Sequence, residues 1–150
     1  MEVAKDGFTV SDNPARLDHD AVWAFISSAY WARSRSREQH EHAIAHSLCV
    51  GVYDGAYDHA YDSAAQIGFA RIITDYAITA HIADVYILEP YRGRGLSKWL
   101  IQTILDHPEL ALVRRFTLNT DDAHGLYTPF GFAALRKPEA MMELWRADGF

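Results

Sequence analysis

The sequence contains one cysteine, Cys49, among 150 residues, so no disulfide can form within the chain. It also lacks any run of about 18 apolar residues, the length that a membrane-spanning helix requires. The first ten residues contain neither a basic lead nor an apolar stretch of signal-peptide length. These features predict a soluble protein of a reducing compartment, and we expect a cytoplasmic location with no membrane partner.

An excess of basic residues is also missing. The chain has 14 Lys and Arg against 20 Asp and Glu, which gives a formal net charge of −6. A nucleic-acid-binding domain would show clustered positive charge, so we expect no nucleic-acid partner. The acidic balance weakly favours cationic partners through long-range steering.

What is present is the composition of a folded domain. Hydrophobic residues make up 49% of the chain and charged residues 23%, close to the average of globular proteins. A chain of 150 residues without repeats or low-complexity tracts suits one compact domain, which we expect to span residues 1–150.

The hydrophobic pattern predicts strands and helices in mixed order. Expected strands are Phe8–Val10, Leu48–Tyr53, Gln66–Thr74, Thr79–Leu88, Arg115–Thr120 and Met141–Trp145. Helices are expected after an Asp18 N-cap, over about Ser36–His46, from Leu96 to before Pro108, and over Asp122–Tyr127. Asp54–Ala65 has no apolar periodicity and is expected to be a long, mobile hairpin loop. Such an order predicts an α/β or α+β fold.

The most informative segment is a glycine-rich loop between the strand ending near Leu88 and the helix beginning at Leu96. Glycine lets the backbone approach an anion closely, and a helix N-terminus offers unpaired N–H groups and a positive dipole end. Arg92, Arg94 and Lys98 add positive charge. The segment therefore predicts a pyrophosphate site, although a glycine pair taken alone could also be a solvated basic turn.

Two familiar phosphate loops do not fit this segment. The dinucleotide fingerprint requires a third glycine, and Lys98 stands at that position. A Walker loop requires Gly-Lys-Ser/Thr after four spacer residues, and the chain lacks it here.

The loop resembles the signature Gln/Arg-x-x-Gly-x-Gly/Ala of the GNAT superfamily of N-acetyltransferases. It matches at the Arg and the first Gly of that signature and departs at its last position, where Ser97 stands. The resemblance implies a GNAT-like α/β (α+β) fold, with a mixed, mostly antiparallel central sheet flanked by helices and splayed at the central strand. It also implies that backbone near Val85, Tyr86 and Ile87 pairs with the pantetheine arm of acetyl-CoA. The residues that it assigns to the coenzyme A pyrophosphate are Arg92, Gly93, Arg94, Gly95, Leu96, Ser97 and Lys98.

A second segment, Leu126–Phe132, resembles the Leu-Tyr-x-x-x-Gly-Phe motif of the same superfamily. The resemblance implies that Tyr127 protonates the departing thiolate, and a phenol with a pKa near ~10 suits that role. A tyrosine that only packs and hydrogen-bonds is the alternative. Asn119 ends the preceding strand, where it could hydrogen-bond pantetheine or simply terminate the strand.

An amine that attacks a thioester must lose a proton, and Asp84 is the candidate base or anchor for the amine. It is an acid within an otherwise apolar strand, and the alternative is a structural pair with an arginine such as Arg71. Tyr30 and Trp31 are candidates for the acceptor pocket or for core packing. His124 could share a helical face with Tyr127, or act only as a cap.

Taken together, these motifs predict an enzyme that transfers an acetyl group from acetyl-CoA to an amine, most simply a small molecule, by direct attack within a ternary complex. The alternatives are a non-catalytic acyl-CoA-binding module and a protein-binding module with a degenerate pocket. Homodimers are compatible with the sequence but not indicated by it. We expect no metal, because His40, His42 and His46 lack a completing ligand set, and we expect Cys49 to be an inert thiol.

Overall fold

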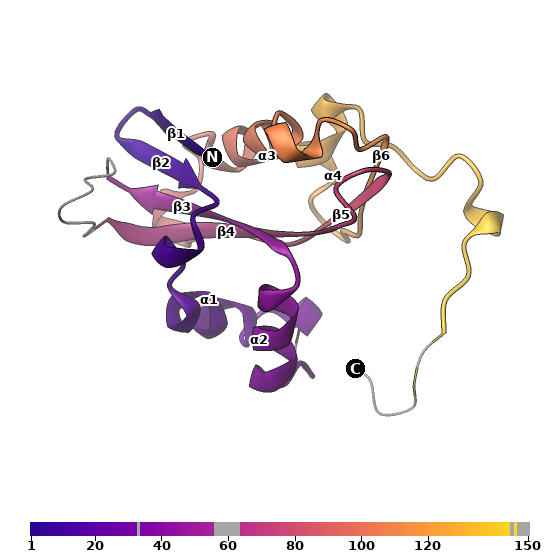
Figure 1. Ribbon diagram of the computed structural model, residues 1–150, viewed down its shortest axis with the longest axis horizontal. Coiled ribbons are helices and arrows are strands. Elements are labelled where there is room, and N and C mark those ends of the chain that lie inside the picture. Colours follow the sequence, from indigo (N-terminus) through magenta and orange to yellow (C-terminus); the bar gives the residue numbers. More distant parts are fainter. Residues whose placement is uncertain (33, 56–63, 145, 147–150) are drawn as a thin grey trace.

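A computed structural model describes residues 1–32, 34–55, 64–144 and 146 (Figure 1). Within them, six strands form one sheet in the order β1-β2-β3-β4-β5-β6. The strands are β1 (Glu2–Lys5), β2 (Phe8–Ser11), β3 (Leu48–Asp54), β4 (Ala65–Thr74), β5 (Thr79–Ile87) and β6 (Arg115–Leu118). The α-helices are α1 (His19–Ile26), α2 (Arg37–Ala45), α3 (Leu96–Leu105) and α4 (His124–Tyr127).

The sheet is mixed and mostly antiparallel, as the resemblance implied. Each neighbouring pair from β1 to β5 is antiparallel, whereas β5 and β6 are parallel and joined through α3. Figure 1 shows α3 and α4 on one face of the sheet and α1 and α2 on the other. The predicted fold class is therefore confirmed.

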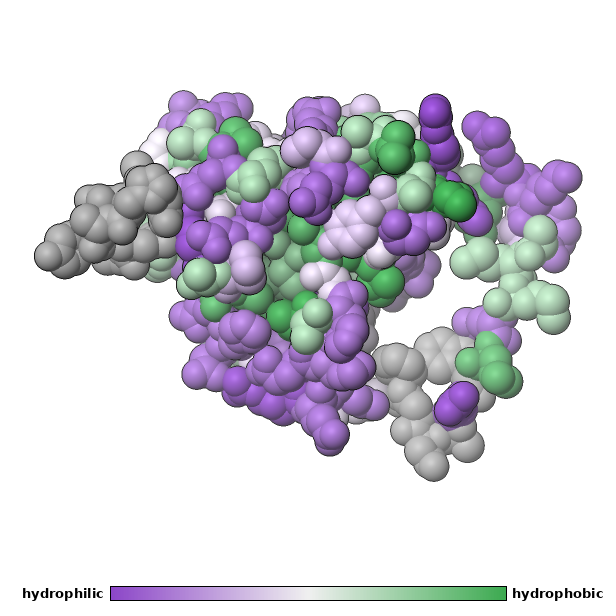
Figure 2. All heavy atoms as spheres, viewed as in Figure 1, coloured by the Kyte–Doolittle hydropathy of each residue, from purple (hydrophilic) through white to green (hydrophobic). Residues whose placement is uncertain are grey.

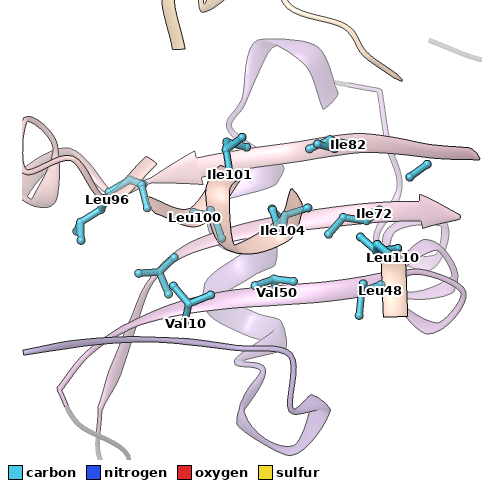
Figure 3. Packing of buried hydrophobic residues seen from close by; sticks show 14 of the residues in the cluster. Val10, Leu48, Val50, Ile72, Ile82, Leu96, Leu100, Ile101, Ile104 and Leu110 are labelled. Carbon is cyan, nitrogen blue, oxygen red and sulfur yellow. The ribbon is translucent and has the colours of Figure 1, made fainter. Parts of the chain in front are cut away.

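The main core lies between α3 and the sheet. Leu100, Ile101 and Ile104 have no exposed surface and point from α3 toward Val50, Ile72 and other strand residues (Figure 3). Their spacing places them on one side of the helix, so α3 forms because burying that side removes apolar surface from water. This packing fixes the N-terminus of α3 beside the end of β5.

A second apolar cluster holds α1 and α2 against the opposite face. Val22, Ile26 and Ile44 are buried together with Phe69 of β4 and Tyr86 of β5. The α1 helix begins where predicted, because the Asp18 side chain accepts a hydrogen bond from the amide of Ala21 at 2.9 Å. The cluster also positions the short 3-10 turn Tyr30–Ala32, which leads into α2.

The first strand, β1, was not predicted from the sequence. Residues Glu2–Lys5 are all exposed, so they carry no apolar alternation that would have marked a strand. The hairpin is made instead by its turn, in which Asp6 and Gly7 adopt positive φ angles of 51° and 83°. Asp-Gly is the residue pair that such a turn favours, and this signal was available in the sequence.

The predicted last strand, Met141–Trp145, is wrong for the residues that the structure describes. Met141–Leu144 forms no strand, since among the described residues no neighbouring strand pairs with it. The predicted loop over Asp54–Ala65 is shorter at both ends, because Asp54 belongs to β3 and Ala65 to β4. Residues 56–63 lie outside the described part.

In the described ranges, no helix is long and apolar enough to cross a membrane.

His40 of α2 is a buried histidine without a polar partner. It has no exposed surface, its ring lies 5.2 Å from that of Trp23, and neither ring nitrogen has a hydrogen-bond partner among the described residues. Burial lowers the pKa of His40, Arg35 and Arg71 lower it further, and Glu41 and Asp84 act the other way. Protonation therefore favours the unfolded chain.

We accordingly predict that His40→Leu retains or raises the melting temperature at pH 7, because it removes a buried, unsatisfied polar group. The free energy of unfolding of the wild type should fall as the pH drops from about 6.5, the ordinary histidine pKa of the unfolded chain, toward the lowered pKa of His40 in the folded chain. This loss should be smaller in the variant. Thermal unfolding from pH 7 to pH 5 measures both effects. His42→Leu, an exposed position on the same helix, is the control, and an equal acid loss in all three proteins would contradict the assignment.

Candidate functional site

The site begins where β5 separates from β6. Among the described residues, β6 pairs with β5 from Thr79↔Arg115 to Ile82↔Leu118 and no further. Asp84 then adopts φ +54°, which is rare for residues other than glycine, and the register with β4 shifts between Phe69 and Arg71. One edge of Val85–Ile87 is thus left without a neighbouring strand in the described part, and the splay expected at this strand is present.

A first cavity, of about 430 Å³, surrounds the glycine-rich loop. Gly93 and Gly95 have φ angles of 77° and 79°, and a Cβ added to either would meet no atom within 4 Å. Gly95 is the N-cap of α3 and offers no side chain to its first amides, which have no partner within the helix. The lining residues are Ile87, Tyr91, Arg92, Gly93, Gly95, Leu96, Ser97, Lys98, Gly125 and Leu126.

This cavity suits an anion with an extended tail. Unpaired helix amides, the positive end of the helix dipole and the side chain of Lys98 converge on it. Arg92 Nε donates to the carbonyl of Ile87 at 3.0 Å and so ties the loop to the end of β5. Arg94 is absent from the lining, and its guanidinium lies 5.6 Å from the centre of the Tyr91 ring.

A second cavity, of about 380 Å³, lies further back along β5. It brings together the Tyr30–Ala32 turn, Arg35 before α2, β4, β5, the segment between β6 and α4, and α4 itself. Several predicted residues line it, namely Tyr30, Trp31, Asp84, Val85, Asn119 and Tyr127. Arg71, named from the sequence only as a structural partner of Asp84, also lies in its wall. The remaining polar residues of the wall were not predicted to belong to the site: Arg35, His81, Thr120 and Asp122.

Asp84 is held by two arginines. Arg35 donates to both of its carboxylate oxygens, at 2.9 and 3.0 Å, and Arg71 Nε donates to Oδ2 at 2.7 Å. The Asp84 side chain is 2% exposed. Burial alone would raise the pKa of Asp84, but the two guanidinium groups lower it overall. Asp84 therefore stays ionised, and the pairing with Arg71 that the sequence left open is observed.

His81 of β5 is a neutral base in the same wall. Its Nδ1 lies 2.9 Å from Thr117 Oγ1, and that hydroxyl donates to the carbonyl of Ala80 at 3.4 Å. When the hydroxyl donates to Ala80 and accepts from Nδ1–H, the lone pair of His81 is on Nε2. Burial and the charge of Arg71 lower the pKa of His81, so it is unprotonated at neutral pH.

Tyr127 is a phenol that lines the same cavity. It comes from α4, is 7% exposed, and its ring centre lies 5.9 Å from that of Phe132. Burial, followed by the charge of Asp122, raises the pKa of Tyr127. The phenol therefore keeps its proton at neutral pH and can donate it within the cavity.

The mouth of this cavity is aromatic and acidic. Tyr30 and Trp31 pack edge to face at 5.0 Å between ring centres and are 46% and 38% exposed. Partial desolvation raises the pKa of Tyr30, and the nearby carboxylates of Asp122 and Asp121 raise it further. The Tyr30–Ala32 turn and the segment before α4 thus meet across the opening.

Two predicted residues, Asn119 and His124, have other surroundings than expected. Asn119, predicted to contact the coenzyme, lines the second cavity rather than the cavity of the glycine-rich loop. His124 is exposed and is absent from both linings. Burial raises the pKa of Cys49 to about 12, which disfavours the thiolate form that reacts.

The histidines of α2 do not form a ligand set. The rings of His42 and of His46, the C-cap of α2, lie 4.3 Å apart between centres with an angle of 32° between their planes, and His40 is buried against Trp23. No group of three or more His, Cys, Asp and Glu side chains that could hold a metal ion occurs in the described residues.

Comparisons with known proteins agree with this geometry. The profile of the acetyltransferase (GNAT) family matches residues 17–132. A crystal structure of a GNAT-family protein of Xanthomonas campestris is 36% identical, with a TM-score of 0.82 over 95% of this chain and 96% of the other. A Gibberella zeae protein provisionally named an acetyltransferase is 28% identical over 89% of this chain and 84% of its own length. A GNAT-family acetyltransferase of Elizabethkingia anophelis, solved with acetyl-CoA bound, shares the fold at 15% identity, with a TM-score of 0.61 over 96% of this chain and 92% of the other.

The Asp84 ion cluster predicts a large cost for neutralising its carboxylate. Asp84→Asn leaves two guanidinium groups buried without their counter-charge, and breaking a buried pair in this way costs about 3–5 kcal/mol of unfolding free energy. Urea unfolding at pH 7 measures the loss. Asp121→Asn, an exposed acid nearby, should change stability by less than about 0.5 kcal/mol. Equal stability of the two variants would show that the cluster is not a stabilising element.

Proposed function

Because the chain belongs to the acetyltransferase (GNAT) family, we propose that it transfers the acetyl group of acetyl-CoA to the amine of a small molecule, with both substrates bound at once. The observation that carries the proposal is the sharing of β5 by two cavities. Val85 lines the second cavity, and Ile87, two residues on, lines the first. A donor in one cavity and an acceptor in the other would therefore meet at the splay.

The first cavity fits coenzyme A. Its open space over Gly93 and Gly95 accepts phosphate groups close to the backbone, and the α3 amides provide donors for them. The unpaired edge of Val85–Ile87 provides backbone groups for the amides of the pantetheine arm, in the manner of an added strand. Bound acetyl-CoA supplies the activated acetyl group as a thioester.

We assign proton removal from the amine to His81. Its Nε2 carries the lone pair, the ring lines the acceptor cavity, and the Thr117 hydroxyl fixes its orientation. Asp84 is a weaker candidate for the base, since both of its oxygens are already bound by arginines. We assign Asp84 to positioning: its ion pairs hold Arg35 and Arg71 in the wall and stabilise the bulge at the splay.

Tyr127 is the proposed proton donor to the thiolate of coenzyme A as it departs. Backbone N–H groups near Val85 and Tyr86 are the proposed donors to the thioester oxygen as negative charge develops on it. Both proposals rest on the same fact, that α4 and the bulged part of β5 face one cavity.

The acceptor cavity favours a small amine with an apolar portion. A volume of about 380 Å³ is that of a small-molecule site, and the rings of Tyr30 and Trp31 form one side of its mouth. Asp122 lines the same opening and would attract a protonated amine before it is deprotonated.

Coenzyme binding should be visible as thermal stabilisation. We predict that acetyl-CoA raises the melting temperature of the wild type and that Gly95→Trp abolishes the shift, because the indole would occupy the phosphate cavity. Gly7→Trp is the matched control: Gly7 also has a positive φ angle and open space at its Cβ, but lies in the β1–β2 turn, so it should keep the shift. No shift in the wild type at millimolar acetyl-CoA would overturn the proposed function.

Catalysis should depend on His81 and Tyr127. With the best acceptor from a panel of primary amines, His81→Ala and Tyr127→Phe are each predicted to lower kcat by about 10²-fold or more, measured as release of the coenzyme A thiol. Added imidazole should restore part of the activity of His81→Ala. His124→Ala, at an exposed position outside both cavities, is the control. A thermal shift without turnover on any amine would favour a coenzyme-binding module instead.

A further inference from the structure

The wall of the second cavity carries more positive than negative charge. Arg35 and Arg71 each contribute a guanidinium group, and both bind the single carboxylate of Asp84. Asp122, another acid of the lining, is exposed, so water screens its charge. The ion cluster of Asp84 therefore keeps a net positive charge beside the cavity.

Packing shields this charge from water. The side chains of Arg35 and Arg71 are only 15% and 9% exposed. On the face seen in Figure 2, mostly hydrophilic residues cover the layer of α1 and α2, yet Arg35, just before α2, turns inward to Asp84. A buried charge is costly without a counter-charge, so this wall would stabilise an anion that enters the cavity.

His81 reports the sign of the charge. Burial lowers its pKa most, Arg71 lowers it next, and Asp84 raises it by less. The potential in this part of the cavity is therefore positive. A positive potential attracts an anionic group, and it also favours the unprotonated form of an amine that lies next to His81.

Both arginines retain a donor nitrogen for a ligand. Arg71 uses Nε on Asp84 and Nη1 on the Ser47 hydroxyl, at 2.7 and 3.2 Å, and within the described ranges nothing accepts from Nη2. Arg35 uses Nη1 and Nη2 on Asp84, and its Nε has no acceptor in the same ranges. Hydrogen bonds from a guanidinium to a carboxylate are among the strongest that proteins form.

The arginines lie within reach of the proposed base. Arg71 pairs with Ala83 and Ile73 with His81, so Arg71 and His81 are diagonal neighbours on one face of the sheet. Diagonal neighbours of an antiparallel pair stand about 7–8 Å apart. One small molecule can therefore present an anion to Arg71 and an amine to His81 when few atoms separate the two groups.

We propose that the acceptor is an aminocarboxylate, of the type of an amino acid with an apolar side chain, whose carboxylate binds Arg35 and Arg71 while its amine lies at His81. This inference rests on the proposed function, since it names the acceptor of that reaction. Before deprotonation such a molecule carries an ammonium group as well, and Asp122 provides the complementary charge.

The apolar portion has its own place in the cavity. Tyr30, Trp31 and Ile73 line it and are 46%, 38% and 45% exposed, so each has apolar surface left to cover. A side chain that packs there would remove this surface from water. Polar recognition of the carboxylate and apolar recognition of the side chain thus come from different walls.

The reaction then runs as follows for this acceptor. The ammonium gives one proton to water, and the amine nitrogen bonds to the carbonyl carbon of the thioester. The carbon–sulfur bond breaks with its electron pair on sulfur, His81 takes the second proton of the nitrogen, and Tyr127 gives one to sulfur. His81 returns its proton to water and Tyr127 regains one. The products are an N-acetyl aminocarboxylate, the coenzyme A thiol and one released proton.

The first experiment compares matched acceptors by release of the coenzyme A thiol. L-Phenylalanine, L-leucine, L-methionine and L-tryptophan are each tested against the corresponding amide, which lacks only the negative charge. We expect kcat/KM to be higher for the acid by about tenfold or more in the best pair. The amine of the amide is the weaker base and so is less protonated, which means that basicity cannot produce this preference.

The second experiment assigns the preference to the wall. Arg71→Lys keeps a positive charge beside Asp84 but removes the planar fork, so the ratio of kcat/KM between acid and amide should fall toward one. Because the ratio is taken within one protein, a loss of folded protein cancels from it. Arg114→Lys, at an exposed position outside both cavities, is the matched control and should keep the ratio.

The third experiment measures binding without turnover. With and without coenzyme A, 10 mM 3-phenylpropionate should raise the melting temperature of wild type and of Arg114→Lys more than 3-phenylpropanamide does at equal ionic strength. Arg71→Lys should lose the difference.

The outcomes separate this inference from the proposed function. Transfer to amines with equal kcat/KM for acid and amide in every pair would overturn the inference and leave the proposed function standing. Stabilisation by the acid alone, without transfer to any amine, would support the carboxylate site and contradict the proposed function. Neither transfer nor acid-selective stabilisation would overturn both.

Discussion

The carboxylate of Asp84 and the guanidinium groups of Arg35 and Arg71 hold the site together. Arg35 precedes α2, Arg71 belongs to β4, and Asp84 is the bulged residue of β5. One buried carboxylate therefore connects the helical layer on one face to the strand that splays. A buried charge is costly unless it is paired, and a positive φ at a non-glycine residue is costly unless its surroundings hold it. The buried charge of Asp84 is tolerated because the two arginines pair with it, and its positive φ angle is tolerated because the same ion pairs hold the residue in place.

This constraint arranges chemistry along a single strand. His81, Asp84, Val85 and Ile87 all belong to β5, and the bulge falls among them. Before the bulge, β6 covers the edge of the strand and supplies Thr117 to orient His81. After it, the edge has no neighbouring strand among the described residues and leads toward the N-terminus of α3. A neutral base, a structural ion cluster and an open backbone edge thus follow one another within seven residues of chain.

Features encoded within a few consecutive residues were predictable. The glycine-rich loop, the Asp18 cap and the amphipathic α3 each depend on neighbours in sequence, so local rules identified them. His81 was not predicted because its surroundings depend on Thr117, 36 residues away, and on burial that only packing creates. Arg35 was missed for a similar reason, since its partner Asp84 lies 49 residues downstream. The strand pattern at Met141–Trp145 was misread because a strand also requires a partner, which sequence periodicity does not report.

The sequence by itself determined the family, through two segments that resemble its motifs. It also determined the order of most elements and the position of the glycine-rich loop, because these follow from short-range backbone preferences and apolar periodicity. The tertiary structure decided the protonation states and the partnerships. Whether Asp84 is a free base or a locked counter-ion, and whether His81 is charged, depends on the desolvation and neighbouring charges that folding brings together. Those quantities are properties of three-dimensional surroundings, so residues far apart in the chain, and not the motif itself, set them.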